Sequence, residues 1–160
     1  MKKYLLLIII LGLGYSEICS DTLDWCFSSS MQSAYYFFIN VEINDEIIES
    51  GSVVGPNDGI WQCPESDCDI IGAFYNNVNL GWTYPFNNNG YTVPVMMNDG
   101  NFTDYINSGE IPEFRLFDRS TGIIYNTAAS EDLPECNNMG FEIINSLEST
   151  NEWLENIEYS

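Results

Sequence analysis

Short segments rich in aromatic and β-branched residues, each bounded by turn-forming residues, are the feature that most restricts the fold of this chain. The segments read as strands are residues 35–43, 47–54, 70–75, 78–84, 91–97, 114–118, 123–125 and 141–144. Asn, Asp, Gly and Pro fill the intervals between them, and a helical period is absent before the C-terminal end. This pattern predicts an all-β domain, and we expect an antiparallel β-sandwich of about seven to eight short strands rather than a barrel.

The clearest strand is predicted over residues 35–43, where apolar side chains recur at every second position. Its expected core face consists of Tyr35, Phe37, Ile39, Val41 and Ile43, while Asn40 and Glu42 point to solvent.

Two hairpins are predicted from their turns. Asn76-Asn77 joins residues 70–75 to 78–84, because Asn tolerates the left-handed conformation that such turns require. A second turn is predicted at residues 119–122 (Arg-Ser-Thr-Gly), which join 114–118 to 123–125. Pro94 interrupts the strand 91–97 and indicates that this strand lies at a sheet edge.

The two ends of the chain differ from its centre. Lys2 and Lys3, an apolar run over 5–11 and the small residues Gly14 and Ser16 predict a secretory signal of residues 1–16, with a cut as late as residue 20 as the alternative. The β-domain is then expected over 21–147. Residues 148–160 form an acidic segment in which the sequence from Ser149 to Glu152 permits a short helix, the alternative being a frayed tail.

The charge balance excludes several functions. The 160 residues include 24 acidic and 4 basic side chains and no histidine, and the formal net charge is -20. Removal of the signal leaves Arg115 and Arg119 as the only cations. Because phosphate groups need a Lys/Arg surface, we expect neither a nucleic-acid partner nor binding to an anionic membrane surface. We also expect no membrane insertion after cleavage, because the apolar run is too short to span a bilayer comfortably and leaves with the signal. Ser-His and Cys-His catalysis and His-ligated zinc are excluded with histidine absent.

Five cysteines in an exported chain indicate disulfides. A cut after residue 20 would remove Cys19 and leave Cys26, Cys63, Cys68 and Cys136. The favoured pairing is Cys63 with Cys68 in a small loop and Cys26 with Cys136 across the domain, although four cysteines allow three pairings.

Two groups of residues are candidate ligand sites. Asn98, Asp99, Asn101 and Asp104 surround Gly100 with oxygen atoms of the kind that Ca2+ prefers, and the alternative is an ordinary turn. The aromatic residues Trp61, Trp82, Tyr84 and Tyr91 could stack on sugar rings, and the alternative is that they fill the core. We identify no catalytic residues, because among 24 acids some pair always looks suitable.

Four segments carry a family resemblance: FSSSMQSAYYFF (27–38), IGAFYNNVNLGW (71–82), VPVMMNDG (93–100) and IPEFRLFD (111–118). They resemble a β-sandwich module of secreted, multi-modular surface proteins of marine bacteria, over roughly residues 23 to 147. Asn79 stands where such modules often carry Cys. The resemblance implies a structural fold at the cell surface and no catalytic signature.

We therefore expect a secreted or cell-surface, non-catalytic β-module with adhesion, structural or protein-interaction roles. The alternative is a carbohydrate-binding module that uses the loop aromatics with the help of calcium. Its partner would be a protein or polysaccharide at the cell surface. Sugar binding predicts exposed, nearly coplanar aromatic rings, whereas an interaction module predicts an exposed sheet edge or apolar patch.

Overall fold

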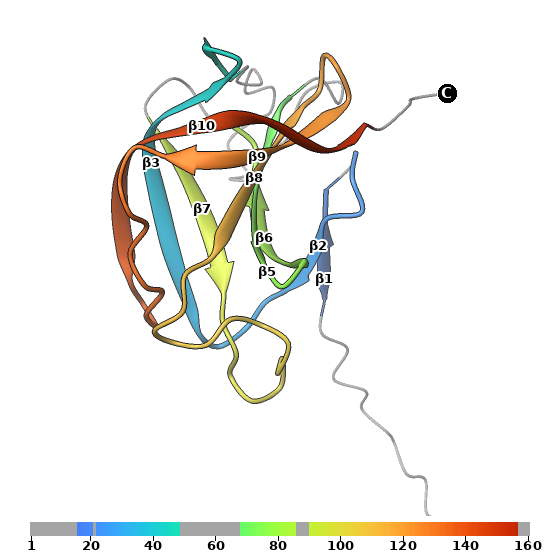
Figure 1. Cartoon of the computed structure of the whole chain (residues 1–160). Helices are drawn as coiled ribbons and strands as arrows, with labels where there is room; N and C mark the ends of the chain where they lie inside the picture. Colours follow the sequence, from blue (N-terminus) through green and yellow to red (C-terminus); the bar gives the residue numbers. More distant parts are fainter. Residues whose placement is uncertain (1–15, 21, 49–67, 86–89, 157–160) are drawn as a thin grey trace, which may run out of the picture.

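The computed structural model describes residues 16–20, 22–48, 68–85 and 90–156, and every regular element in these ranges is a strand (Figure 1). The prediction of an all-β domain is confirmed. The strands are β1 (Glu17–Cys19), β2 (Cys26–Ser28), β3 (Ser33–Ile43), β4 (Glu46–Ile47), β5 (Ile70–Tyr75), β6 (Val78–Thr83), β7 (Tyr91–Met96), β8 (Glu113–Asp118), β9 (Ile123–Ala129) and β10 (Phe141–Asn156). Within the described ranges we find no helix with the length and apolar character needed to cross a membrane.

Eight strands form one curled sheet in the order β4-β3-β10-β9-β8-β5-β6, with β7 paired to β3, while β1 and β2 form a separate hairpin. β10 runs parallel to β3, and the other pairs are antiparallel. The described sheet differs from the predicted antiparallel sandwich, because it is mixed and curls into a half-barrel (Figure 1). The parallel partners of β3 and β10 lie about a hundred residues apart, so no local pattern could indicate their pairing.

The curled sheet encloses the main core, and the β1–β2 hairpin covers a second one. The main core contains Tyr36, Phe38, Leu80, Val93, Leu116 and Leu147 among others. The second consists of Leu23, Trp25, Ile70, Phe74, Phe117 and Ile124. β5 is buried on both faces because Ile71 and Ala73 point into the main core while Ile70 and Phe74 point toward the hairpin.

The two ends of the sheet, β6 and β7, approach each other closely without a strand ladder between them in the described part of the chain. A Cβ atom at Gly81 of β6 would lie 2.1 Å from the Pro94 carbonyl oxygen of β7. β7 pairs only with β3 in this part of the chain, which confirms that Pro94 marks an edge strand.

The predicted core face of β3 is wrong in its first half. Ala34, Tyr36 and Phe38 are buried there, whereas Tyr35 and Ile39 are exposed and Phe37 is half-buried. The burial phase changes after Phe38, so that Val41 and Ile43 point inward as expected. The error has a simple cause: both faces of residues 35–39 carry large apolar side chains, and period-two alternation cannot distinguish them.

Both predicted hairpins are confirmed. Asn76 and Asn77 have positive φ values of 49° and 65°, and they connect β5 to β6 in antiparallel register. Residues 119–122 connect β8 to β9. Of the strand predicted over 47–54, the structure describes only Ile47 in β4 and the following residue, and 49–67 lie outside the described residues. The C-terminal helix is wrong, because residues through Asn156 continue β10.

The predicted Cys26–Cys136 disulfide is also wrong. The β1–β2 register places Cys19 opposite Cys26, their Cα atoms are 4.0 Å apart, and the two sulfur atoms are bonded. Cys136 is a free thiol in the main core, and burial raises its pKa to about 11. Cys68 is disulfide-bonded, and Cys63 lies outside the described residues. A signal cut before Glu17 retains the Cys19–Cys26 bond, whereas a cut after Ser20 would remove Cys19.

Candidate functional site

An apolar patch on the outside of the curled sheet is the surface feature that best fits a binding role. The patch, called here the β3–β10 apolar face, consists of Tyr35, Phe37 and Ile39 of β3 with Phe141 and Ile143 of β10. The exposed fractions are 39% for Tyr35, 52% for Ile39, 56% for Phe141 and 62% for Ile143. Soluble monomers rarely expose contiguous large apolar side chains, so such a patch indicates an interaction site.

Strand register builds this face. Tyr35 lies beside Phe141 and Phe37 beside Ile143 in the parallel β3–β10 ladder, so four side chains form two adjacent rows. On the other side of β3, Pro94 of β7 is the register partner of Tyr35, so the row formed by Tyr35 and Phe141 continues onto β7. The inward partners on the same strands, such as Tyr36, are fully buried, which fixes the exposed residues on the outside.

The aromatic centre of the β3–β10 apolar face is held in place from two sides. The rings of Phe37 and Phe141 stack with their centroids 6.1 Å apart and an interplanar angle of 28°. Gly90 packs against the tip of the Phe37 ring, where a Cβ atom would lie 2.1 Å from the ring carbon Cζ. Gly90 also has a φ of 99°, which side chains rarely tolerate, so glycine is required there for two reasons.

Carboxylates lie where the apolar face ends. Glu42 and Glu148 are direct register partners in the parallel β3–β10 ladder, each next to an inward-pointing apolar residue, which places both on the outer side. Glu42 accepts a hydrogen bond from Asn40, and Glu148 accepts one from Ser146. Glu131 accepts hydrogen bonds from the backbone and side-chain nitrogens of Asn145, an exposed residue two positions after Ile143.

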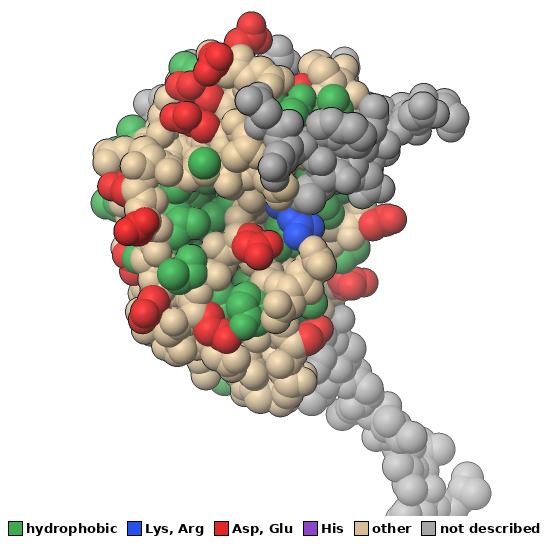
Figure 2. All heavy atoms as spheres, viewed as in Figure 1, with side chains coloured by type: hydrophobic (Ala, Val, Ile, Leu, Met, Phe, Trp, Pro, Cys, Tyr) green, Lys and Arg blue, Asp and Glu red, His purple; other side chains and the backbone are tan. Residues whose placement is uncertain are grey.

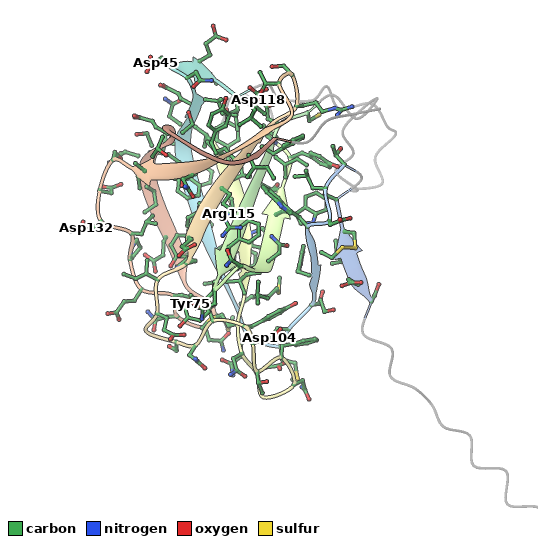
Figure 3. All side chains as sticks on the ribbon, turned by 45° about the vertical axis from the view of Figure 1, so that its right-hand side comes forward. Asp45, Tyr75, Asp104, Arg115, Asp118 and Asp132 are labelled. Atoms are coloured by element: carbon green, nitrogen blue, oxygen red, sulfur yellow. A yellow bond between two sulfur atoms is a disulfide. The ribbon has the colours of Figure 1, made fainter. Side chains whose placement is uncertain are left out.

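No positive side chain lies on β3, β7 or β10, since the four cations of the sequence are Lys2, Lys3, Arg115 and Arg119. Arg115 is on β8 at the middle of the view in Figure 3. It packs over the Phe74 ring at 4.1 Å and lies 3.7 Å from the Glu113 carboxylate. Figure 2 shows Asp and Glu side chains spread over the viewed face and a small blue area. The described surface is therefore strongly negative.

A concave feature lies beside the start of β8 and the end of β9. This groove has a volume of about 730 Å³. Its lining consists of Pro112, Glu113, Phe114, Asn126, Thr127, Ala129, Leu133 and Thr150. Apolar surface is visible between the carboxylates on this side in Figure 2. Glu113 is the one carboxylate among the described residues of this lining, so these residues alone do not supply the facing pair of acids on which glycoside hydrolysis depends.

Of the aromatic residues predicted to bind sugar, the three that the structure describes do not form a flat platform. Trp82 and Tyr84 are half-buried neighbours whose rings meet edge to face, 5.1 Å apart at 71°. Both pack against the second core. Tyr91 is 3% exposed in the main core, where burial raises its pKa, and Trp61 lies outside the described residues. Among the described residues, the nearly parallel pair that includes an exposed ring is Phe37 and Phe141.

The predicted calcium residues form a hydrogen-bonded turn between β7 and β8. One oxygen of Asp99 accepts bonds from the backbone N–H groups of Asn101 and Phe102, and the other accepts one from Met31. These bonds, that from Met31 foremost, lower the pKa of Asp99 to about 2. Asn98 Oδ1 accepts a bond from Gly100 N.

Asp104 is exposed, in the loop at the bottom of Figure 3. Turn formation thus accounts for the oxygen-rich pattern around Gly100, and calcium binding stays a prediction.

Other clusters of titratable groups have structural roles. Glu110 accepts hydrogen bonds from the Tyr75 hydroxyl at 2.5 Å and from Asn107 N at 2.7 Å, and the Tyr75 bond contributes most to lowering the Glu110 pKa. In the described ranges, the single group with metal-ligand spacing is Glu17, Cys19 and Cys26, whose two sulfur atoms are joined in the disulfide.

Comparisons with known proteins add no functional information: no family model, curated protein or solved structure matches this chain. The candidate site consequently depends on geometry alone. Sequence reasoning assigned Tyr35, Phe37 and Ile39 to the core and left Phe141 and Ile143 in an unremarkable strand. The available signal was the unbroken run of apolar residues from 34 to 39, which a half-buried strand does not need.

Proposed function

We propose that this chain is a secreted, non-catalytic interaction module that docks a protein partner on the β3–β10 apolar face. The observation that carries the proposal is the exposure of Tyr35, Ile39, Phe141 and Ile143 in two adjacent rows of paired strands. Interfaces are enriched in aromatic residues at their centres and polar at their rims. This face has the same arrangement, with the stacked pair Phe37 and Phe141 at its centre and polar residues at one end.

A rigid sheet supports this role better than a loop would. β3 is paired with β10 on one side and with β7 on the other over residues 35–38, so the backbone beneath the aromatic rings is hydrogen-bonded along both edges. Side chains held this way lose little conformational freedom on binding, which reduces the entropic cost of association. The role as a cell-surface or adhesion component rests on the family resemblance and the predicted signal.

Site-specific photocrosslinking tests the proposal. The photoreactive amino acid p-benzoylphenylalanine replaces Phe141, and the variant is produced in the organism that makes this chain. We expect a crosslinked protein adduct from position 141 and none from position 104, an exposed loop position that serves as control. Equal adducts from both positions, or none from position 141, would contradict docking on this face.

Carbohydrate binding is the second candidate, and one observation favours it: the Phe37 and Phe141 rings lie only 28° from parallel. Sugar rings stack on such surfaces, although polar groups that fix hydroxyl orientation are also needed. Affinity electrophoresis through a panel of polysaccharides, with calcium or with chelator, distinguishes the two functions. Retardation that is lost in Phe141→Ser would establish a sugar-binding face, and unchanged migration in every gel would leave the protein partner.

A further inference from the structure

We propose that the partner of the β3–β10 apolar face is a basic protein surface, in which Lys or Arg side chains flank an apolar centre. This inference rests on the proposed docking function and adds the chemistry of the partner. The observation that supports it is that Glu42 and Glu148 are cross-strand neighbours at the end of the apolar rows. Each accepts a hydrogen bond from a neutral neighbour, Asn40 or Ser146, and no cation of the chain lies on either strand.

Like charges directly opposite each other in a sheet are destabilising by a few tenths of a kcal/mol up to about 1 kcal/mol. Within the described part of the chain neither carboxylate forms an ion pair, and Arg115 pairs with Glu113 on β8, so the repulsion between Glu42 and Glu148 is not relieved there. A cation placed between the two carboxylates by a partner would relieve it. The same partner would cover Phe141 and Ile143 with apolar side chains and leave little polar surface unpaired.

The charge distribution argues against a second copy of this chain as the occupant. The whole chain carries a formal charge of -20, so two copies repel each other on approach, and a two-fold contact with its axis along the strands would also bring Glu42 and Glu148 of both copies together. A negatively charged membrane surface is disfavoured for the same reason. A partner with positive charge is attracted over the whole approach, and the apolar rows then determine where it docks.

Four capped, fluorescent peptides serve as probes of the secreted chain 17–160 in an anisotropy titration. Their sequences alternate Leu with Lys, Leu with Ser, Leu with Glu, and Ser with Lys. We expect the Leu/Lys peptide to bind most tightly, because only it supplies both the apolar and the cationic component. Phe141→Ser should weaken it at low and at high salt, since apolar burial is not screened.

The carboxylates are tested by Glu42→Gln with Glu148→Gln, and Asp24→Asn with Asp104→Asn is the matched control. The control removes the same charge from two exposed loop positions. At about 50 mM NaCl the Gln pair should weaken Leu/Lys binding about fivefold, and at about 500 mM NaCl the difference should disappear. The Gln pair should also raise the thermal midpoint slightly. A raised midpoint would show that the variant is folded and that Glu42 and Glu148 repel each other in the parent chain.

The outcomes separate this inference from the proposed function. Equal weakening by the control pair would mean diffuse attraction to an acidic protein and would overturn the inference. A different result is that the Leu/Ser peptide binds as tightly as the Leu/Lys peptide and loses this binding in Phe141→Ser. That result would contradict a basic partner and would still support docking on the β3–β10 apolar face. If Phe141→Ser changes the binding of none of the peptides, both the inference and the docking function fail.

Discussion

The β1–β2 hairpin packs on the sheet through a contact between Trp25 and Gly72 that is possible because glycine has no side chain. A Cβ atom at Gly72 of β5 would lie 2.6 Å from Cζ3 of Trp25 and 2.7 Å from Cε2 of Phe74. Such distances force a displacement, so Gly72→Ala should reduce the free energy of unfolding by about 1 to 3 kcal/mol, as overpacking does. Trp25→Ala should cost about 3 to 5 kcal/mol, because it empties the centre of the second core.

The double variant Gly72→Ala with Trp25→Ala decides whether this contact is responsible. The alanine methyl would then occupy space that the indole has left, so the loss should fall short of the sum by about 1 to 2 kcal/mol. Urea unfolding followed by far-UV circular dichroism measures this, since 2 kcal/mol moves the midpoint by about 1 M. Trp25→Ala with Gly100→Ala is the control, because nothing lies within 4 Å of a Cβ atom at Gly100. Additivity in both pairs to within about 0.5 kcal/mol would refute the reasoning.

Three further predictions concern single positions. Alkylation of the unfolded, unreduced chain should modify one thiol, that of Cys136, and mass spectrometry of a Cys26–Cys136 peptide would contradict this. Gly81→Ala should lower stability by about 3 kcal/mol in urea unfolding, because its methyl meets the rigid Pro94 carbonyl, and an unchanged midpoint would show that β6 and β7 are not in contact. Asp99→Ala should destabilise the chain near neutral pH. The folded pKa of about 2 lies below the ordinary 3.8, so the stabilisation that the Asp99 carboxylate provides is present above pH 4 and is lost as the pH falls to about 2. Thermal midpoints across that pH range check it, and a midpoint raised by Ca2+ over EDTA would support the calcium hypothesis.

Short sequence patterns correctly predicted the features of this fold that depend on neighbouring residues. The Asn76-Asn77 turn and the edge position of Pro94 depend on backbone conformations and hydrogen-bond donors that a single residue type determines. The parallel pairing of β3 with β10 depends on contacts between residues far apart, and the all-β prediction could not choose between a sandwich and a half-barrel without it. The disulfide prediction failed for a different reason: the observed bond is local in sequence, but the prediction assumed that Cys19 leaves with the signal.

The candidate site was hidden by the same ambiguity that misassigned β3. In Tyr35, Tyr36, Phe37 and Phe38 every position is aromatic, so the sequence predicts a strand with two apolar faces and does not indicate what covers the second. For a strand in a small domain the usual expectation is one buried face and one solvated face. The prediction of a half-buried strand therefore assigned the face of Tyr35 and Phe37 to the core, and it assigned no role to the face of Tyr36 and Phe38.

β5 and β3 carry the same kind of pattern, and the fold treats them differently. Both faces of β5 are apolar, and the chain covers the outer one with its own β1–β2 hairpin through Leu23 and Trp25. The outer face of β3 is equally aromatic, yet Phe141 and Ile143 beside it remain more than half exposed. Uncovered apolar surface in water opposes solubility and gains nothing for the isolated domain, and no element in the described part of the chain covers Phe141 and Ile143 on this second face. A partner that occupies this face would have the role that the hairpin has on β5, and the uncompensated carboxylates Glu42 and Glu148 indicate that its rim is basic.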